Sequence, residues 1–368
     1  MKNTFGTGIQ LTLFGESHGE SIGAVLDGLT PGIPVDEQEI SRQLSRRRPS
    51  GESDTSRREA DCFRIVSGVF CGKTTGTPLC ILIPNEDKKS ADYEKMREIA
   101  RPSHADYAAF CKYHGQEDYR GGGHFSGRVT AALVAASAIL QDALLRKKIR
   151  IGTHILTCGG VCDRAFACDP RADVEHLREA SFPVLDGEKA RPMTDAILAA
   201  KRENDSIGGV IQTAVTGLPA GLGEPWFDSV EGVLSHALFS IGGIKGIAFG
   251  AGFRTAELSG SRFNDAFRIE QGRVVTKTNN NGGINGGITN GMPVVFDCAV
   301  KPTPSIARPQ ETVNFVRKEN TTLSIEGRHD PAILRRICPV VDSVTALVLC
   351  DLLTQRYGTD VFLREEAL

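Results

Sequence analysis

The sequence predicts an α+β fold in a single domain over residues 1–368, with two outer antiparallel sheets around a central layer of helices. Three observations favour this β-α-β sandwich. The two halves of the chain, roughly 1–150 and 200–355, contain similar short motifs in the same order. In each half, strand-like runs alternate with an amphipathic helical pattern. A long apolar helix then closes each half. Together they predict a pseudo-two-fold internal repeat.

The repeat begins with a strand-like run and a glycine turn. Residues 21–25 (SIGAV) return as 206–210 (SIGGV), and the turn 28–32 (GLTPG) returns as 217–221 (GLPAG). The alternative is coincidence, because glycine and proline punctuate both halves in the same way.

A helical pattern follows in both halves, over 36–47 and about 227–239. Asp36 and Glu39 have the spacing of a capping box, and apolar residues of the first helix fall on one face. We therefore expect each of these helices to lie against the core along one side.

Strands and long helices complete the halves. The apolar strands 79–83 and 294–300 each follow a Gly-x-Pro turn. The helices 128–145 and 332–353 carry apolar residues on more than one face, which indicates burial between layers.

Composition excludes several classes of protein. The 43 basic and 45 acidic residues give a net charge of -2, which does not suit wrapping nucleic acid or coating a membrane. The first residues lack a basic stretch followed by an apolar one, and the longest apolar segment, 129–140, is too short to span a bilayer. We expect a soluble, cytoplasmic protein.

The ten cysteines lie far apart, with no Cys-x-x-Cys pair. Cys158, Cys162 and Cys168 form a loose cluster, but their spacing fits no common zinc pattern. No disulfide framework and no metal site are expected.

Glycine is abundant, at 40 residues, which indicates tight turns or close approach of the backbone to a ligand. The motif 14–19 (FGESHG) places His18 at a strand exit, where an imidazole suits protonation of a leaving group. A surface-turn histidine without a role is the alternative.

Six arginines and no lysine occur between residues 42 and 58. The planar guanidinium favours bidentate recognition of phosphate or carboxylate, and Pro49 is expected to hold the cluster at a loop. The alternative is a solvated helix end whose cations complement the helix dipole.

Two further motifs lie before the helix 128–145: 101–107 (RPSHADY) and 118–128 (DYRGGGHFSGR). Triple glycine ahead of a helix lets backbone N–H groups approach an anion, although the spacing is that of neither a Rossmann fingerprint nor a P-loop.

The second half contributes 279–291 (NNNGGINGGITNG), 301–305 (KPTPS) and 327–331 (GRHDP). Asparagine and glycine alone can be simple turn formers. Combined with the basic motifs, they predict a site for a small phosphorylated anion, with Asp330 as an ionised base.

Seven of these blocks resemble the chorismate synthase family, in the family's order, between residue 6 and about residue 353. The resemblance implies an anti-1,4-elimination of phosphate from 5-enolpyruvylshikimate 3-phosphate to give chorismate. It also implies a requirement for reduced FMN without net redox change, and a homotetramer.

The family positions imply roles for individual residues. His18 matches the group that protonates the departing phosphate, and His104 matches the group that stabilises the reduced, anionic flavin. Asp330 matches the aspartate implicated in proton removal through flavin N5, and Ser17 and Ser126 match serines that support proton transfer. The implied substrate-binding residues are Arg46, Arg47, Arg48, Arg128 and Arg328. The implied flavin-binding residues are His124, Phe125, Ser126, Gly242, Gly243, Gly286, Lys301, Pro302, Thr303, Pro304, Ser305 and Arg328.

Some positions depart from the family pattern. Where many members carry an arginine linked to nicotinamide nucleotide contact, this chain has Glu52, Ser53 and Asp54. NADPH is therefore expected only if the protein reduces its own flavin, and the alternative is an external flavin reductase. The loop at 124–128 is also altered, with His124 as a substitute donor, and Ser103 replaces a common glycine.

Two other functions fit part of the pattern. A flavin-dependent oxidoreductase acting on another phosphorylated acid would use the same glycine loops and arginines. A nucleic-acid-binding module would use residues 42–58, but net charge and the lack of interleaved aromatic residues argue against it.

Overall fold

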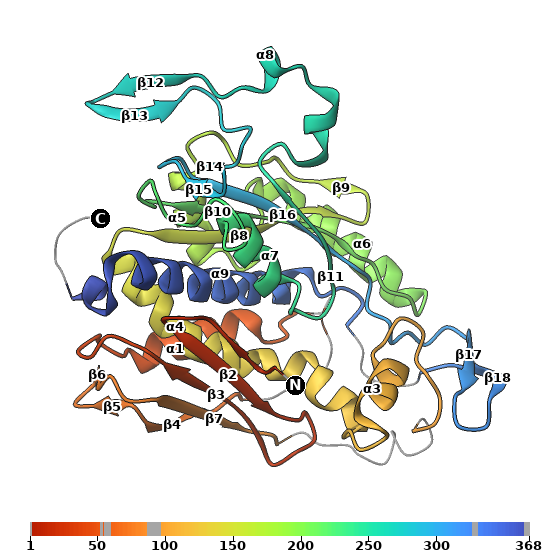
Figure 1. The fold of residues 1–368 in the computed structure, drawn as a ribbon. Coiled ribbons are helices and arrows are strands. Elements are labelled where there is room, and N and C mark those ends of the chain that lie inside the picture. Colours follow the sequence, from red (N-terminus) through yellow and green to blue (C-terminus); the bar gives the residue numbers. More distant parts are fainter. Residues whose placement is uncertain (1, 52–53, 55–59, 87–96, 326–329, 364–368) are drawn as a thin grey trace.

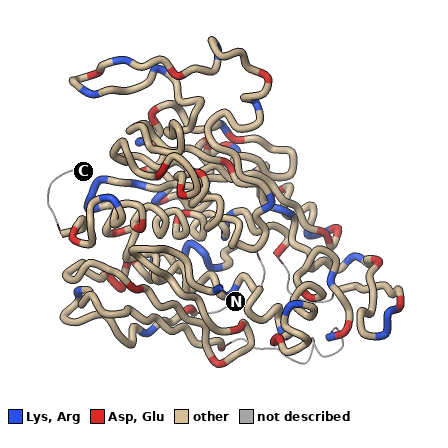
Figure 2. The backbone as a smooth tube through the Cα atoms, in the orientation of Figure 1, with Lys and Arg blue, Asp and Glu red and all other residues tan. Residues whose placement is uncertain are grey.

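The computed structural model describes residues 2–51, 54, 60–86, 97–325 and 330–363. Two five-stranded antiparallel sheets lie on opposite sides of a group of helices (Figure 1). The predicted α+β class is confirmed. Acidic and basic residues are interspersed over both halves, and neither sign is confined to one of them (Figure 2).

The first sheet is built from the N-terminal part of the chain. Its strands, in spatial order, are β1 (Thr4–Phe5), β2 (Gln10–Gly15), β3 (Ser21–Asp27), β7 (Leu79–Pro84) and β4 (Arg64–Ser67). Inward-facing side chains of β7 alternate with half-buried ones, the burial pattern of a strand with one face on the core. The predicted strand 79–83 is confirmed, one residue longer at its end.

The second sheet comes from the later part of the chain. Its strands, in spatial order, are β11 (Ile244–Phe249), β16 (Val294–Val300), β10 (Gly209–Thr216), β8 (Arg150–Cys158) and β9 (Val161–Cys162). The strand predicted at 294–300 is confirmed with these bounds. The strand β8 lies between the two predicted halves and belongs to this sheet.

Four strands of each sheet, three central and one at an edge, follow the same spatial order. In the first sheet this order is β2, β3, β7, β4, and in the second it is β8, β10, β16, β11. Along the chain, both sets also occur in the same sequence of elements: two strands, a helix, two strands and a long helix, with further elements inserted between them. The intervening helices are α1 (Glu37–Arg47) and α7 (Val230–Leu238), and the long ones are α4 (Thr130–Arg146) and α9 (Leu334–Tyr357).

Helix boundaries follow local capping. Asp36 is the N-cap of α1, and its carboxylate accepts hydrogen bonds from the backbone N–H groups of Gln38 and Glu39. The reciprocal half of the capping box does not form, because the Glu39 carboxylate binds Arg42 and Gln43 instead.

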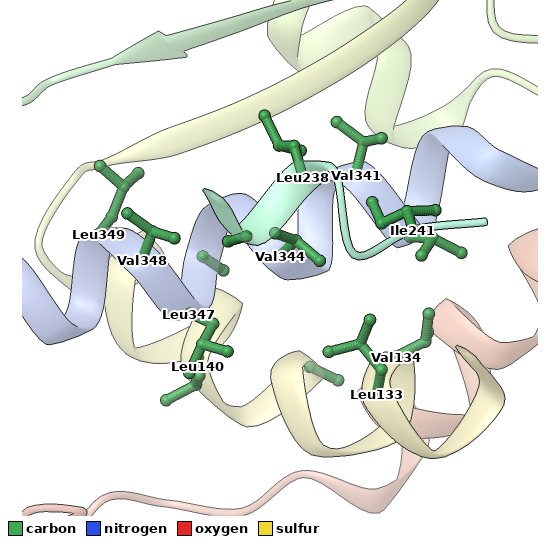
Figure 3. Packing of buried hydrophobic residues seen from close by; sticks show 14 of the residues in the cluster. Leu133, Val134, Leu140, Leu238, Ile241, Val341, Val344, Leu347, Val348 and Leu349 are labelled. Carbon is green, nitrogen blue, oxygen red and sulfur yellow. The ribbon is translucent and has the colours of Figure 1, made fainter. Parts of the chain in front are cut away.

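The core lies where α4 and α9 cross between the sheets. Alanines of α4 are buried from Ala131 to Ala136, and their small side chains allow α9 to approach closely. Figure 3 shows Leu133 and Leu140 of α4 facing the side of α9 that carries Leu347, with Leu238 and Ile241 covering another side of α9.

Both long helices are apolar enough to cross a membrane by length and composition alone. The apolar window of α4, counted with the preceding turn, is 78% buried and that of α9 is 100% buried. Both are therefore core helices, and the buried helices predicted at 128–145 and 332–353 are confirmed with small shifts of their ends.

Shorter elements decorate the two layers. The helices are α3 (Asp106–Tyr113), α5 (Arg171–Glu179), α6 (Ala190–Arg202) and α8 (Gly260–Phe263). The hairpins pair β5 (Val69–Phe70) with β6 (Lys73–Thr74), β12 (Phe267–Glu270) with β13 (Arg273–Thr276), β14 (Ile284–Asn285) with β15 (Ile288–Thr289), and β17 (Gln310–Asn314) with β18 (Glu319–Leu323). The five 3₁₀ turns in the described part are Arg120–Phe125, Gly127–Val129, Gly187–Lys189, Gly252–Glu257 and Thr359–Phe362.

Candidate functional site

His18 is held in the turn that follows β2. Its side chain is nearly buried, with 5% of its surface exposed, and Nδ1 lies 3.0 Å from the hydroxyl oxygen of the buried Ser17. The same hydroxyl lies 3.2 Å and 3.3 Å from the carbonyl oxygens of Arg120 and Gly121. When the Ser17 hydroxyl donates its proton to either carbonyl, its oxygen can accept a hydrogen bond from Nδ1–H of His18. The proton of His18 that can be exchanged is then the one at Nε2.

The triple glycine packs directly against this histidine. All three glycines have positive φ, at 59°, 83° and 51° for Gly121, Gly122 and Gly123. A Cβ on Gly121 would lie 2.2 Å from Cε1 of His18, and one on Gly122 would lie 3.3 Å from Cε1 of His104. The motif is therefore a close-packed turn between two imidazoles. We call Ser17, His18, His104 and this turn the glycine–histidine site.

His104 is bound to a carboxylate on its own segment. Its Nδ1 lies 2.6 Å from Oδ1 of Asp106, the first residue of α3. Arg101 binds the same carboxylate through Nε at 2.7 Å and Nη2 at 2.6 Å. Burial alone would raise the pKa of Asp106, but the hydrogen bonds from Arg101 and His104 hold that pKa well below its usual range.

A lysine from the second half reaches this segment. The ammonium group of Lys301 donates to the carbonyl oxygen of Ser103, and its backbone N–H donates to Gly243 at 2.9 Å. Burial, followed by repulsion from Lys245, lowers the pKa of Lys301. The two halves of the chain therefore meet at the loop that carries His104.

The altered loop after the triple glycine has mainly local contacts. Nδ1 of His124 lies 2.8 Å from the carbonyl oxygen of Gly15, so this histidine fastens the His18 turn. Phe125 packs edge-on against Tyr113 and lines a pocket with His104 and Tyr119. The hydroxyl of Ser126 accepts a hydrogen bond from the backbone of Arg128 at 3.3 Å.

Three predicted substrate-binding arginines converge on one buried carboxylate. Arg128 donates from Nη1 to Oδ1 of Asp61, Nε of Arg48 lies 3.4 Å from Oδ2, and Nη1 of Arg47 lies 4.0 Å from Oδ2. Asp61 is 4% exposed. We call these four residues the arginine cluster. Among its arginines, Arg48 is the most exposed, at 32% of its side chain.

Arg46 points elsewhere. Its guanidinium lies 3.1 Å from Oδ2 of Asp342 on α9 and 2.8 Å from Oε1 of Gln43. Burial raises the pKa of Asp342, and the attraction of Arg46 opposes that rise. Arg46 therefore joins α1 to α9, and its role in substrate binding stays a prediction.

Asp330 lies beside an arginine that sequence reasoning did not single out. Nη1 of Arg336 donates to Oδ2 of Asp330, and Nε of the same residue donates to the carbonyl oxygen of Arg47 at 3.1 Å. The backbone oxygen of Asp330 accepts from the hydroxyl of Thr303 at 2.6 Å. Arg336 therefore links the predicted base to the arginine cluster, and the backbone of Asp330 itself binds the 301–305 loop.

Within the described ranges, no group of three or more histidine, cysteine, aspartate or glutamate side chains has the arrangement of a metal site. The ten cysteines are free thiols.

Comparison with known proteins decides the family. A family model described as chorismate synthase matches residues 9–354. The chain belongs to the chorismate synthase family. The chorismate synthase of Methanocella arvoryzae is 44% identical over 354 residues, covering 95% of this chain and 93% of that protein. The chorismate synthase of Thermococcus kodakarensis is 42% identical over 357 residues, covering 97% and 99%.

The fold agrees with this assignment. A solved structure described as the crystal structure of chorismate synthase superposes with a TM-score of 0.77 at 28% identity, covering 97% of this chain and 94% of that one. Chorismate synthase is a lyase of the shikimate pathway, which leads to the aromatic amino acids.

One departure from the chorismate synthase pattern has a structural counterpart. Asp54 is 5% exposed, and its Oδ2 accepts from the backbone N–H of Ser50 at 2.6 Å and from Nη2 of Arg335. A carboxylate that binds an arginine of α9 therefore occupies the region where many members have an arginine. Glu52 and Ser53 lie outside the described residues.

Not every predicted flavin residue lies in one place. Gly286 forms the tip of the β14–β15 hairpin, before β16, whereas Lys301 follows the end of β16. The segment before the hairpin lies at the start of β16, where the backbone N–H of Val295 donates to the carbonyl oxygen of Gly282 at 3.2 Å. A strand of this length spans about 20 Å, so the β14–β15 hairpin and Lys301 lie toward opposite ends of β16 (Figure 1). Gly242 and Gly243, in contrast, lie near Lys301, because the backbone N–H of Lys301 donates to Gly243 at 2.9 Å. A Cβ on Gly242 would meet nothing within 4 Å.

Several partners were missed by sequence reasoning. Asp61, Asp106 and Lys245 lacked a motif of their own, and Arg335 and Arg336 were absorbed into a helical pattern. A signal did exist for Asp106, which stands two residues after His104 within a quoted motif. Arg57, Arg58 and Arg328 lie outside the described residues.

Proposed function

We propose that this chain is a chorismate synthase, which converts 5-enolpyruvylshikimate 3-phosphate into chorismate and phosphate by anti-1,4-elimination. One observation carries the proposal: His18 and His104 pack on neighbouring glycines of a single turn, in a chain that matches the family model over residues 9–354. Two positioned imidazoles beside cationic loops suit proton transfer near an anion.

His18 protonates the leaving phosphate. Its Nδ1 is tied to the hydroxyl of Ser17, so Nε2 is the nitrogen that exchanges a proton with a ligand. Burial of both residues excludes water from the imidazole and strengthens its interaction with an anionic oxygen. Ser17 orients the ring through the carbonyl groups that flank the triple glycine.

The arginine cluster holds the negative groups of the substrate. Arg48 is the most exposed member, and Arg47 and Arg128 contact the same carboxylate of Asp61. Guanidinium groups bind phosphate and carboxylate through paired hydrogen bonds. In this arrangement Asp61 offsets part of the cluster's charge.

Asp330 receives the proton that leaves the substrate ring. Its carboxylate accepts a hydrogen bond from Nη1 of Arg336, which fixes the orientation of the carboxylate. The same arginine binds the backbone of Arg47, which fixes the position of the base relative to the substrate-binding arginines. Ser126 supports proton transfer from its place beside Arg128.

The residues around Lys301 fit a cofactor that carries a phosphate, such as FMN. Burial, followed by repulsion from Lys245, lowers the pKa of Lys301, and a Cβ on Gly242 would meet nothing within 4 Å. Lys301 to Ser305, Gly242 and Gly243 would hold FMN in its reduced form, which makes the reacting substrate electron-rich without net oxidation.

The source of electrons for FMN is an external flavin reductase in our proposal. A buried carboxylate, Asp54, occupies the region where many relatives have an arginine, which disfavours an anionic nicotinamide nucleotide such as NADPH. NADPH would be a cofactor only if the protein reduced its own flavin.

We also propose a cytoplasmic homotetramer. The separation of Gly286 from Lys301 supports an assembly in which loops of different copies come together. Exposed aromatic side chains are consistent with such contacts, since Trp226 is 79% and Phe227 is 94% exposed.

The chain architecture is a β-α-β sandwich with pseudo-two-fold symmetry in this proposal. The shared order of four strands in each sheet supports it. The helices support it too, because α1 and α7 occupy equivalent positions in the chain order of the two halves, as do α4 and α9. The second repeat then begins at β8, near residue 150.

Anaerobic incubation of the protein with reduced FMN and 5-enolpyruvylshikimate 3-phosphate tests the activity. We expect many turnovers of chorismate and phosphate per flavin, without stoichiometric flavin oxidation. Oxidation of one flavin for each substrate consumed would favour a flavin-dependent oxidoreductase and overturn the proposal. Addition of NADPH with oxidised FMN alone then tests whether the protein reduces its own flavin.

A further inference from the structure

Asp106 lies next to His104 but belongs to none of the groups assigned above. Its carboxylate accepts from Nε and the backbone N–H of Arg101 on Oδ2, at 2.7 Å and 3.0 Å, and from Nη2 of Arg101 on Oδ1, at 2.6 Å. The remaining contact of Oδ1 is Nδ1 of His104, at 2.6 Å. Arg101 therefore fixes the carboxylate, and the carboxylate faces the imidazole.

This contact decides which nitrogen of His104 carries the proton. Nη2 of Arg101 also lies 2.9 Å from Nδ1, so an unprotonated Nδ1 has a donor within reach. In that case, however, the lone pair of Nδ1 would also face a carboxylate oxygen at 2.6 Å, which is strongly repulsive. A proton on Nδ1 converts the same contact into a short, charge-assisted hydrogen bond.

The other ring nitrogen faces the glycine turn. A Cβ on Gly122 would lie 3.4 Å from Nε2 of His104, so Nε2 is on the side of the ring toward Gly122. In the described part of the chain, Nε2 has no hydrogen bond. The ring is partly accessible, with 18% of its side chain exposed. Nε2 is the atom through which His104 can meet a ligand.

We propose that Asp106 is a positioning residue that keeps the proton of neutral His104 on Nδ1, so that His104 gives and takes its reactive proton at Nε2. The exchange balances simply: the imidazolium has protons on both nitrogens, and loss of the Nε2 proton leaves the Nδ1–H tautomer. A carboxylate that orients a functional histidine in this way is a recurrent arrangement in proteins. The inference rests on the proposed function for the identity of the reaction.

Asp106→Asn removes the acceptor with little change of shape. Arg101 keeps the oxygen of the new side-chain amide at the Oδ2 position, because its backbone N–H and Nε–H both bind there. Nη2 of Arg101 loses its acceptor at the Oδ1 position and lies 2.9 Å from Nδ1 of His104, where it can donate instead. The NH₂ group of that amide then faces Nδ1 of His104, which must become an acceptor, and the neutral ring carries its proton on Nε2. Asp106→Glu retains a carboxylate and should retain the Nδ1–H tautomer.

Ring ¹⁵N NMR of the ligand-free, histidine-labelled protein reads the tautomer directly, with His104→Gln to assign the signal. We expect the Nδ1–H signature in the wild type and in Asp106→Glu, and the Nε2–H signature in Asp106→Asn. Asp118→Asn is the matched control, because Asp118 lines the same pocket but pairs with Arg120. An unchanged tautomer in Asp106→Asn would overturn the proposal.

Turnover with reduced FMN gives a second readout. Asp106→Asn should lower kcat by about 10- to 100-fold with KM changed less than about threefold, and Asp106→Glu should recover part of the loss. Unchanged kcat in a variant with the altered tautomer would overturn the link to catalysis. Failure of the wild type to form chorismate would instead overturn the proposed function, while the NMR result still decides the tautomer.

Discussion

The glycine–histidine site and the arginine cluster are organised by different forces. In the first, the positive φ of Gly121 and the missing Cβ allow His18 to approach the turn, so backbone shape decides the geometry. In the second, Arg47, Arg48 and Arg128 surround the buried Asp61, so charge decides the geometry. A change of shape should therefore damage the first region most, and a change of charge the second.

Asp61→Asn should cause the largest effect. Loss of its charge leaves neighbouring buried guanidinium groups without this carboxylate, which we expect to lower the free energy of unfolding by about 3–5 kcal/mol. Urea unfolding followed by circular dichroism measures the change. Asp169→Asn, which breaks the exposed pair between Asp169 and Arg171, is the control and should cost less than about 1 kcal/mol.

Inorganic phosphate sharpens this prediction. If charge organises the cluster, phosphate should raise the Tm of Asp61→Asn more than that of the wild type, because an anion can replace the lost carboxylate. Equal increases in Tm would contradict an electrostatic account of this cluster.

His18→Ala should be the next largest change. Loss of a positioned proton donor is expected to lower turnover by about two or more powers of ten, with little effect on the circular dichroism spectrum. Chorismate formation measures it, and His176→Ala, on the exposed surface of α5, should keep near-normal rates. Near-normal turnover in His18→Ala would remove this residue from the proton path.

Gly121→Ala tests the role of shape. The new Cβ would lie 2.2 Å from the His18 ring, and the position has φ of 59°, so the turn must move. We expect a loss of roughly 1–3 kcal/mol in the free energy of unfolding and a marked loss of turnover. Gly127→Ala is the matched control, because a Cβ there would meet nothing within 4 Å. If both variants behave alike, backbone shape does not set the His18 contact.

The smallest effect is the pH dependence of stability through Asp106. Burial would raise its pKa, but hydrogen bonds from Arg101 and His104 hold the folded-state pKa below the unfolded value of about 3.9. The contribution of ionised Asp106 to the free energy of unfolding is therefore complete above about pH 4, and it is lost as the pH falls toward the lowered pKa of the folded state. Between about pH 5 and pH 3, Asp106→Asn should lose less unfolding free energy than the wild type. Parallel urea-derived stability curves would contradict this assignment.

Periodicity and turn residues predicted much of the fold. The strand 294–300 was predicted to the residue, and the burial of α4 and α9 followed from apolar residues on several of their faces. The end of α1 before Pro49 and its start after Asp36 have local causes that the sequence displays. Such features depend on neighbours a few residues apart.

Side-chain partners across the fold were harder to predict. Arg46 belongs to an arginine run, yet its partner Asp342 is 296 residues away, and nothing local distinguishes it from Arg48. Asp61 likewise meets Arg128 only across 67 residues, and Arg336 meets the backbone of Arg47 only across 289 residues. Motifs identified the histidines and glycines of the site and contained the local partner Asp106, whereas the ion pairs of the arginine cluster depend on tertiary packing.

The position of α9 has a consequence for synthesis of the protein. This helix follows both sheets and α4 in chain order, yet its apolar window is entirely buried between the layers. A ribosome therefore completes both sheets and α4 before the segment that covers them has emerged. Until α9 emerges, the apolar face of α4 lacks the helix that covers it, so packing of the two layers against each other must wait for this last long helix.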